Sequence, residues 1–244
     1  MIRKFLALVL VGGVAAGTVA GCGGDEAPTS ASPAPRQTSP SAAPSDTADS
    51  SGYVGRQPFT AKVSEISEDR MPHSWRAGCP VEPSDLRLIT MTYLGFDDES
   101  HTGEMVVNRA VANEVIAIFK QLYEWRFPIR RMELVDEYEG SDFDSIEADN
   151  TSAFNCRRAT GSRNWSQHAY GLAIDINPRE NPYVNADGSV EHKNAKGFAT
   201  RPLRKPGVIN PGDRVVRLFQ KYGWEWGGYW DGAKDYQHFS KEGD

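Results

Sequence analysis

The hydrophobic pattern predicts regular elements from about residue 59 onward. Apolar residues are dense in residues 85–96 and 103–108, which predicts two strands joined by a turn. In residues 109–126 apolar positions recur at intervals of three and four, as on one face of an amphipathic helix. These positions are Val111, Val115, Ile118, Phe119 and Leu122. We expect this helix to lie across a sheet and to end before Pro128.

The remaining pattern is less regular. Residues 129–138 are interpreted as a further strand, residues 177–212 as a long Asn/Pro/Gly loop, and residues 213–222 as a short helix. Strands and helices do not alternate along the chain, so the pattern favours a mixed α+β fold over a doubly wound sheet. We expect a small, antiparallel-rich sheet with flanking helices.

One predicted strand carries an ionisable side chain in an unusual place. In residues 171–177 the large apolar residues Leu172, Ile174 and Ile176 alternate with Gly, Ala, Asp and Asn, so Asp175 lies on the face of small residues. That face leaves open space around the carboxylate. His168 precedes Asp175 by seven residues, across a glycine turn.

The C-terminal segment supplies a third group of the same kind. Residues 235–238 read Asp-Tyr-Gln-His, which makes His238 a candidate partner for His168 and Asp175. Two histidines and one carboxylate leave a coordination position open for water, as in catalytic zinc sites. Asp235 would then lie near the metal without binding it, where a general base is needed. Each residue alone is a weak signal, and the joint pattern is strong.

The N-terminus has the features of an export signal. Residues 1–21 contain a short basic start and a glycine- and alanine-rich apolar run that is poor as a membrane-spanning helix. The small residues before Cys22 resemble the lipobox of bacterial lipoproteins, in which the cysteine is acylated. The alternative is an ordinary signal peptide with a chance cysteine. We expect an extracytoplasmic protein anchored to the membrane through Cys22.

Composition divides the rest of the chain. Residues 22–58 are rich in Ser, Pro, Ala and Gly and predict a disordered tether, whereas residues 59–244 predict one catalytic domain. The net charge is −6 over 244 residues and becomes about −8 without Arg3 and Lys4, so a nucleic-acid partner is not expected. We expect a monomer.

Two cysteines, Cys79 and Cys156, remain beyond the signal. Export would place them where disulfides persist, so we predict that they pair. Two unpaired buried thiols are the alternative. Closing this loop would stabilise the fold by on the order of 4 kcal/mol in the chain-entropy model.

Two segments resemble a known enzyme family. The stretches S-Q-H-A-Y-G-L-A-I-D (166–175) and D-Y-Q-H-F (235–239) are similar to the two signatures of bacterial zinc D-Ala-D-Ala carboxypeptidases and peptidoglycan endopeptidases. This family includes VanY-type enzymes and L-Ala-D-Glu endopeptidases. The upstream half resembles its secreted actinobacterial members. The resemblance implies that His168, Asp175 and His238 bind Zn²⁺ at a sheet face and that Asp235 is the catalytic acid/base.

The resemblance also implies a catalytic arginine upstream of the first histidine. Arg157 is the preferred match, ahead of Arg158 and Arg163, and an ordinary surface ion pair is the alternative. A guanidinium there could stabilise an oxyanion or bind a substrate carboxylate. Gly227 and Gly228 indicate a tight turn at a cleft rim, which makes Trp226 and Tyr229 candidate substrate-binding residues.

The sequence thus predicts a zinc metallopeptidase that hydrolyses peptidoglycan stem peptides with metal-activated water and an aspartate base, as a D-Ala-D-Ala carboxypeptidase. An L-Ala-D-Glu endopeptidase of the same family is one alternative. A wall-binding lipoprotein without catalysis is another, although Asp235 favours catalysis.

Overall fold

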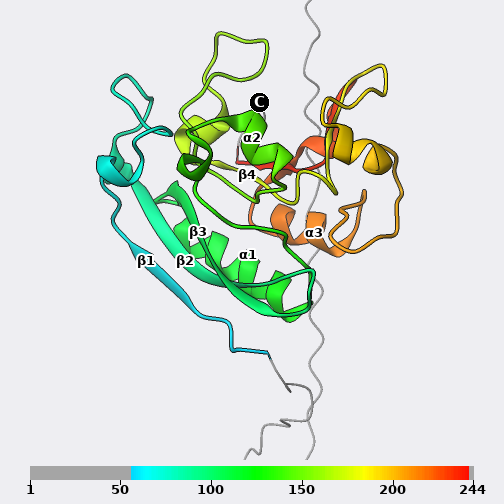
Figure 1. The fold of residues 1–244 in the computed structure, drawn as a ribbon, viewed down its shortest axis with the longest axis horizontal. Helices are drawn as coiled ribbons and strands as arrows, with labels where there is room; N and C mark the ends of the chain where they lie inside the picture. The colour runs from blue at the N-terminus through cyan, green and yellow to red at the C-terminus, as the bar shows by residue number, and fades with distance from the viewer. Residues whose placement is uncertain (1–55, 242–244) are drawn as a thin grey trace, which may run out of the picture. The chain divides into compact units, whose positions relative to one another are not determined.

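A computed structural model describes residues 56–241 of the chain, which belong to one compact unit (Figure 1). Its first sheet is antiparallel, in the order β1-β2-β3. The strands are β1 (Ala61–Ser64), β2 (Leu86–Leu94) and β3 (Ser100–Asn108), and the short 3-10 helices η1 (Glu68–Arg70) and η2 (Pro83–Asp85) precede β2. Helix α1 (Ala112–Glu124) packs against β2 through its buried face.

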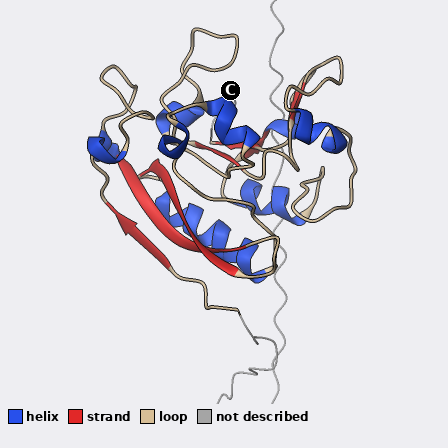
Figure 2. Ribbon diagram, in the orientation of Figure 1, coloured by secondary structure: helices blue, strands red, loops and turns tan. Residues whose placement is uncertain are grey.

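A second antiparallel sheet forms the other half of this unit, in the order β4-β8-β6 (Figure 2). Its strands are β4 (Ala173–Asp175), β6 (Glu225–Trp226) and β8 (His238–Ser240). Strands β5 (Tyr183–Val184) and β7 (Lys234–Asp235) form a separate two-stranded ribbon. The other helices are η3 (Val135–Tyr138), α2 (Asp142–Glu147), η4 (Gln167–Tyr170), η5 (Lys193–Phe198), α3 (Arg214–Lys221) and η6 (Gly227–Tyr229).

The mixed α/β character with small antiparallel sheets and few helices agrees with the sequence-based expectation. The two strands and the helix predicted before residue 128 are confirmed as β2, β3 and α1, and the short helix near the C-terminus is confirmed as α3. Strand β3 begins at Ser100, three residues before the predicted start at Gly103.

The strand predicted for residues 129–138 is wrong. This segment forms only an isolated bridge between Arg131 and Asn150, followed by η3. The physical reason is that side chains satisfy its backbone: the Glu133 amide donates to Oδ1 of Asn150, whose Nδ2 donates back to the Glu133 carbonyl. A regular ladder is therefore not formed, although the apolar side chains are buried.

One core connects α1 to both sheets. The rings of Phe219 in α3 and Phe239 in β8 stack at 3.9 Å between centroids, which fixes α3 against the second sheet. Ile174 and Ile176 are fully buried in the same core. Apolar packing thus holds the strand that carries Asp175 and fixes the position of the Asp175 backbone.

The predicted disulfide between Cys79 and Cys156 is confirmed, with 5.9 Å between Cα atoms. Cys156 belongs to a smaller buried cluster that includes Leu86, Val106 and Phe154. The bond ties the segment before β2 to the segment that leads into the second sheet.

The long connection from residue 177 to residue 212 is anchored by buried asparagine. Nδ2 of Asn181 donates to the carbonyls of Ile176 and Gly207, and Oδ1 of Asn181 accepts from the Ile209 amide. The predicted loop is thus interrupted by β5 and η5. The asparagine bonds satisfy backbone groups of the irregular parts and hold them against the end of β4.

Two buried acids, Asp149 and Glu180, lie beside this connection. Asp149 accepts from the Arg179 amide, and the Arg179 side chain binds Glu180 and approaches Asp149 at 3.7 Å. Burial, followed by the charge of Glu180, raises the pKa of Asp149 to about 8. Folding therefore favours the protonated form of Asp149.

Replacing Asp149 with Asn will flatten the pH dependence of stability. A carboxyl whose pKa rises on folding stabilises the fold fully below its unfolded pKa, and this contribution is lost as pH rises through the folded value, here about 8. For one proton the slope reaches about 1.4 kcal/mol per pH unit. Urea unfolding of both proteins at several pH values across this range measures it. The exposed Asp187→Asn variant is the control, and an unchanged slope in Asp149→Asn would contradict the assignment.

The signal segment, the anchor Cys22 and nearly all of the predicted tether lie outside the described residues. Within residues 56–241, the helices are all too short or too polar to cross a membrane. The domain boundaries therefore stay predictions.

Candidate metal centre

The second sheet brings Asp175 and His238 together by register. Asp175 of β4 stands directly opposite His238 of β8 in the antiparallel pairing. Directly opposite residues project their side chains to the same face, about 5 Å apart at Cβ. The other edge of Asp175 bonds with Ser152, so β4 is paired on both sides. Asp175 and His238 are 63 positions apart in the sequence, and this one strand pair brings them together.

His168 reaches the same face from η4, one turn before β4. The Ser166 hydroxyl caps this helix by accepting from the His168 amide. Gly171 ends it with φ +67°, and a Cβ there would meet the Asn108 amide at 2.5 Å. Only glycine allows this turn to lie so close to the end of β3.

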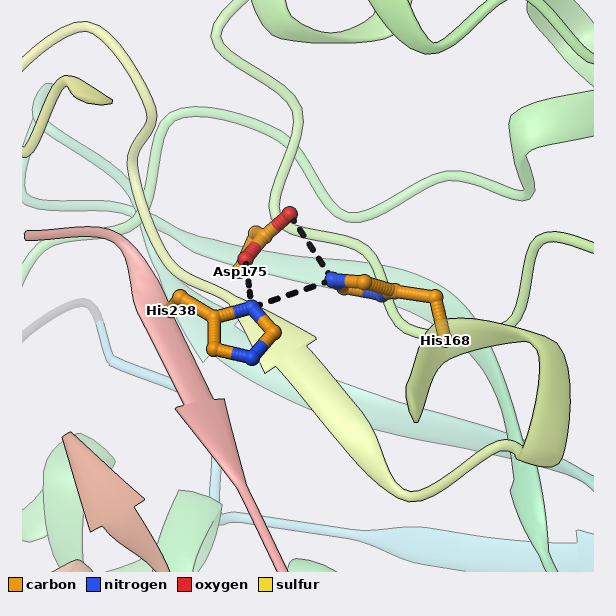
Figure 3. Close-up of side chains that lie close together, drawn as sticks. All are labelled: His168, Asp175 and His238. Atoms are coloured by element: carbon orange, nitrogen blue, oxygen red, sulfur yellow. Dashed lines mark hydrogen bonds and ion pairs between the residues drawn. The ribbon is translucent and has the colours of Figure 1, made fainter. Parts of the chain in front are cut away.

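The three side chains converge on one point, as Figure 3 shows. Nε2 of His168 lies 3.2 Å from Oδ2 of Asp175, and Nδ1 of His238 lies 3.1 Å from Oδ1 of Asp175. The two histidine nitrogens are 3.2 Å apart. Ligands about 2.0–2.1 Å from a tetrahedral zinc ion are themselves about 3.3 Å apart. The His168, Asp175 and His238 group therefore has the spacing of a divalent metal site.

The hydrogen bonds around the cluster suit metal binding. Nδ1 of His168 lies 2.5 Å from the carbonyl oxygen of Ala153 and donates to it, which leaves the Nε2 lone pair directed at the cluster. Burial opposes ionisation of Asp175, but its two histidine neighbours outweigh burial and hold the pKa of its carboxyl well below the usual value. The Ala153 carbonyl could not be predicted from the sequence, because a backbone group has no residue signature.

Asp235 lies in β7 and faces the same region. It is buried, and within residues 56–241 its Oδ1 atom has no hydrogen-bond partner. Burial, followed by the negative charge of Asp175, raises the pKa of Asp235 to about 7, although His238 and Arg157 act in the opposite direction. A divalent cation at the three ligands would favour the ionised form, which can accept a proton.

Gly227 in η6 makes room for Asp235. A Cβ at position 227 would lie 2.7 Å from the Asp235 carbonyl oxygen and 2.9 Å from its Cβ. Any side chain at position 227 would therefore displace the backbone that carries Asp235. The sequence indicated a tight turn at this glycine, but its contact with Asp235 depends on tertiary packing.

The structure places Arg157 at the edge of this region. Its Nε atom lies 2.9 Å from Oδ1 of Asp142 at the start of α2, and its positive charge acts to lower the pKa of Asp235. The ion pair fixes the guanidinium against α2, where the Arg157 side chain is partly buried. The catalytic role predicted for Arg157 stays a prediction.

The two aromatic residues predicted to bind substrate differ in exposure. Tyr229 is 48% exposed, whereas Trp226 is 1% exposed and donates its indole N–H to the Tyr236 carbonyl. Trp226 is therefore a core residue. Trp230, half-buried, has its ring 5.4 Å from the ring of His238 and was not singled out by the sequence analysis. Tyr229 in η6 and Trp230 directly after it therefore have exposed surface that a substrate could contact.

A comparison with protein families bears on this site. Residues 160–241 match a family model described as D-alanyl-D-alanine carboxypeptidase. The matched segment contains His168, Asp175, Asp235 and His238, but not Arg157. It covers about a third of the chain. No curated protein and no solved structure matches the chain significantly.

The match supports the resemblance to the zinc peptidase family and leaves its subtypes open. It indicates a metallopeptidase that acts on peptidoglycan peptides. The three clustered side chains agree with it, because peptidases of this description are metal-dependent and the cluster could bind a metal.

Proposed function

We propose that this protein is a zinc-dependent peptidase that removes the terminal D-alanine from peptidoglycan stem peptides. The observation that carries the proposal is the convergence of three potential ligand atoms at 3.1–3.2 Å, within the segment that matches the carboxypeptidase family. His168, Asp175 and His238 would hold the ion. Two nitrogens and one carboxylate oxygen favour zinc among divalent metals.

When bound, zinc would polarise the scissile carbonyl and make water a nucleophile at neutral pH. The remaining steps belong to side chains. Asp235 would accept the water proton at a carboxylate oxygen and return it to the leaving amine. Its buried, unpartnered Oδ1 suits this role, because no protein donor competes for it within the described chain. No covalent intermediate with the protein is required.

Arg157 would bind the terminal carboxylate of the substrate or stabilise the oxyanion. A guanidinium offers paired N–H donors that match a carboxylate. Its existing partner Asp142 keeps it oriented. Tyr229 and Trp230 would form the aromatic side of the substrate site. Tyr229 is exposed, and the ring of Trp230 lies close to that of His238.

The predicted location completes the proposal. A lipid on Cys22 and a tether over residues 22–58 would let the catalytic unit reach the wall while attached to the outer face of the membrane. We propose an extracytoplasmic lipoprotein that acts as a monomer.

The test is metal analysis of the purified protein, combined with mass analysis of products from defined muropeptides. We expect about one zinc per chain and loss of a single terminal D-alanine from a pentapeptide stem. Cleavage between L-Ala and D-Glu instead would identify the endopeptidase. Bound zinc with no cleavage of either bond would favour the wall-binding lipoprotein and overturn the proposal.

A further inference from the structure

A hairpin rich in arginine immediately precedes η4, the helix that carries His168 of the candidate metal centre. Residues 157–166 fold back on themselves: the Ser166 amide donates to the Arg157 carbonyl, Arg158 bridges to Trp165, and the Ala159 amide donates to the Asn164 carbonyl. We call these residues the arginine hairpin. It projects away from both sheets and leads into η4, which carries His168 (Figure 1).

The side chains of the arginine hairpin carry only positive charge. It contains Arg157, Arg158 and Arg163, and residues 150–174 contain no Asp or Glu, although the whole chain has a net charge of −6. Arg158 and Arg163 are exposed. Within residues 56–241, neither of them forms an ion pair, whereas Arg157 pairs with Asp142.

The hairpin is ordered by its own contacts. The Arg158 guanidinium stacks 3.6 Å from the centroid of the Trp165 ring and donates to the Arg163 carbonyl at 2.8 Å. Arg76 approaches the same ring at 6.0 Å and donates to the Cys156 carbonyl. The disulfide of Cys156 fixes the base of the hairpin. Because the Arg158 guanidinium is held in place, an anion would bind to it with little loss of side-chain entropy.

Both ends of the hairpin also lie near residues of the candidate metal centre. Its first residue, Arg157, is close enough to Asp235 for its charge to act there, and its last residue, Ser166, caps the helix of His168. The hairpin is therefore near enough to the three candidate ligands for part of a bound substrate to contact it.

We propose that the arginine hairpin binds carboxylates of the stem peptide away from the scissile bond and so selects anionic substrates. This inference rests on the proposed function. Arginine pairs with carboxylates through two parallel hydrogen bonds. On a protein of net negative charge, a local cationic loop beside the site also steers anionic ligands toward it. The continuity of the hairpin with the site favours the peptide over phosphate-bearing wall polymers, which share its anionic character.

The test is the double variant Arg158→Gln/Arg163→Gln in the full, zinc-loaded protein. For a stem peptide with free carboxylates, we expect KM to rise about three- to tenfold, with kcat and zinc content unchanged. For the same peptide with its side carboxylates amidated, the two proteins should have equal KM. The control Lys62→Gln/Lys120→Gln removes two charges from β1 and α1 and should leave both values unchanged.

A second measurement separates this inference from the proposed function. The Asp235→Asn protein, with and without the hairpin substitutions, is titrated with the two peptides and with poly(glycerol phosphate). Weaker binding of the free-carboxylate peptide alone supports the hairpin proposal even if no hydrolysis is found. Equal peptide binding, or a loss confined to the phosphate polymer, overturns it while leaving the proposed peptidase intact.

Discussion

Replacing Asp235 with Asn will reduce peptide hydrolysis by about 10²–10⁴-fold, the usual contribution of a positioned acid/base. Asn has nearly the same shape but cannot accept and return a proton. Since Oδ1 of Asp235 has no hydrogen-bond partner within the described residues, the substitution breaks no structural bond there. Zinc content should stay near one per chain, because Asp235 is not among the three clustered side chains.

Steady-state hydrolysis of a defined muropeptide and metal analysis of the same sample measure both expectations. The matched control is Asp231→Asn, a substitution of the same kind at an exposed position four residues earlier, which should retain activity. If Asp235→Asn hydrolyses the peptide at the wild-type rate, the assignment of the base is wrong. If it loses zinc instead, Asp235 has a role in metal binding.

Replacing His168 with Ala will abolish stable zinc binding and with it all hydrolysis above background. The cluster has three side chains, and two remaining ligands, Asp175 and His238, cannot hold the ion in a tetrahedral set. The vacated space also leaves the Ala153 carbonyl without its donor, since Nδ1 of His168 binds it at 2.5 Å.

A readout independent of activity is the rise in melting temperature on addition of zinc. A ligand that binds only the folded protein raises the midpoint, so the wild type should show the rise and the variant should not. His192→Ala is the control, because His192 binds Glu147 away from the cluster and should keep the zinc response. A full zinc response in His168→Ala would remove His168 from the ligand set.

Short-range sequence patterns predicted much of this fold and of the candidate site. The three-and-four spacing in α1 and the apolar runs of β2 and β3 are short-range patterns, and their elements formed where expected. His168 and Asp175 lie within eight residues of each other, so one turn and one strand position both. The motif around His238 then identified the third member, and the structure places all three together.

Other features depended on contacts between distant segments. Residues 129–138 have a strand-like composition, but Asn150 takes their backbone bonds and prevents a ladder. Trp226 and Trp230 belong to one aromatic run, and only the packing of β6 against β8 buries the first and leaves the second beside His238.

The amino-acid pattern alone therefore predicted the candidate ligands, the main elements and the paired cysteines of this protein. Three features could be seen only in the folded chain. Asp175 stands opposite His238, the Ala153 carbonyl orients His168, and Gly227 leaves room for the backbone of Asp235. The reason is physical: periodicity reports which face of an element is apolar, whereas strand register and close backbone approach arise only when segments far apart in sequence pack together.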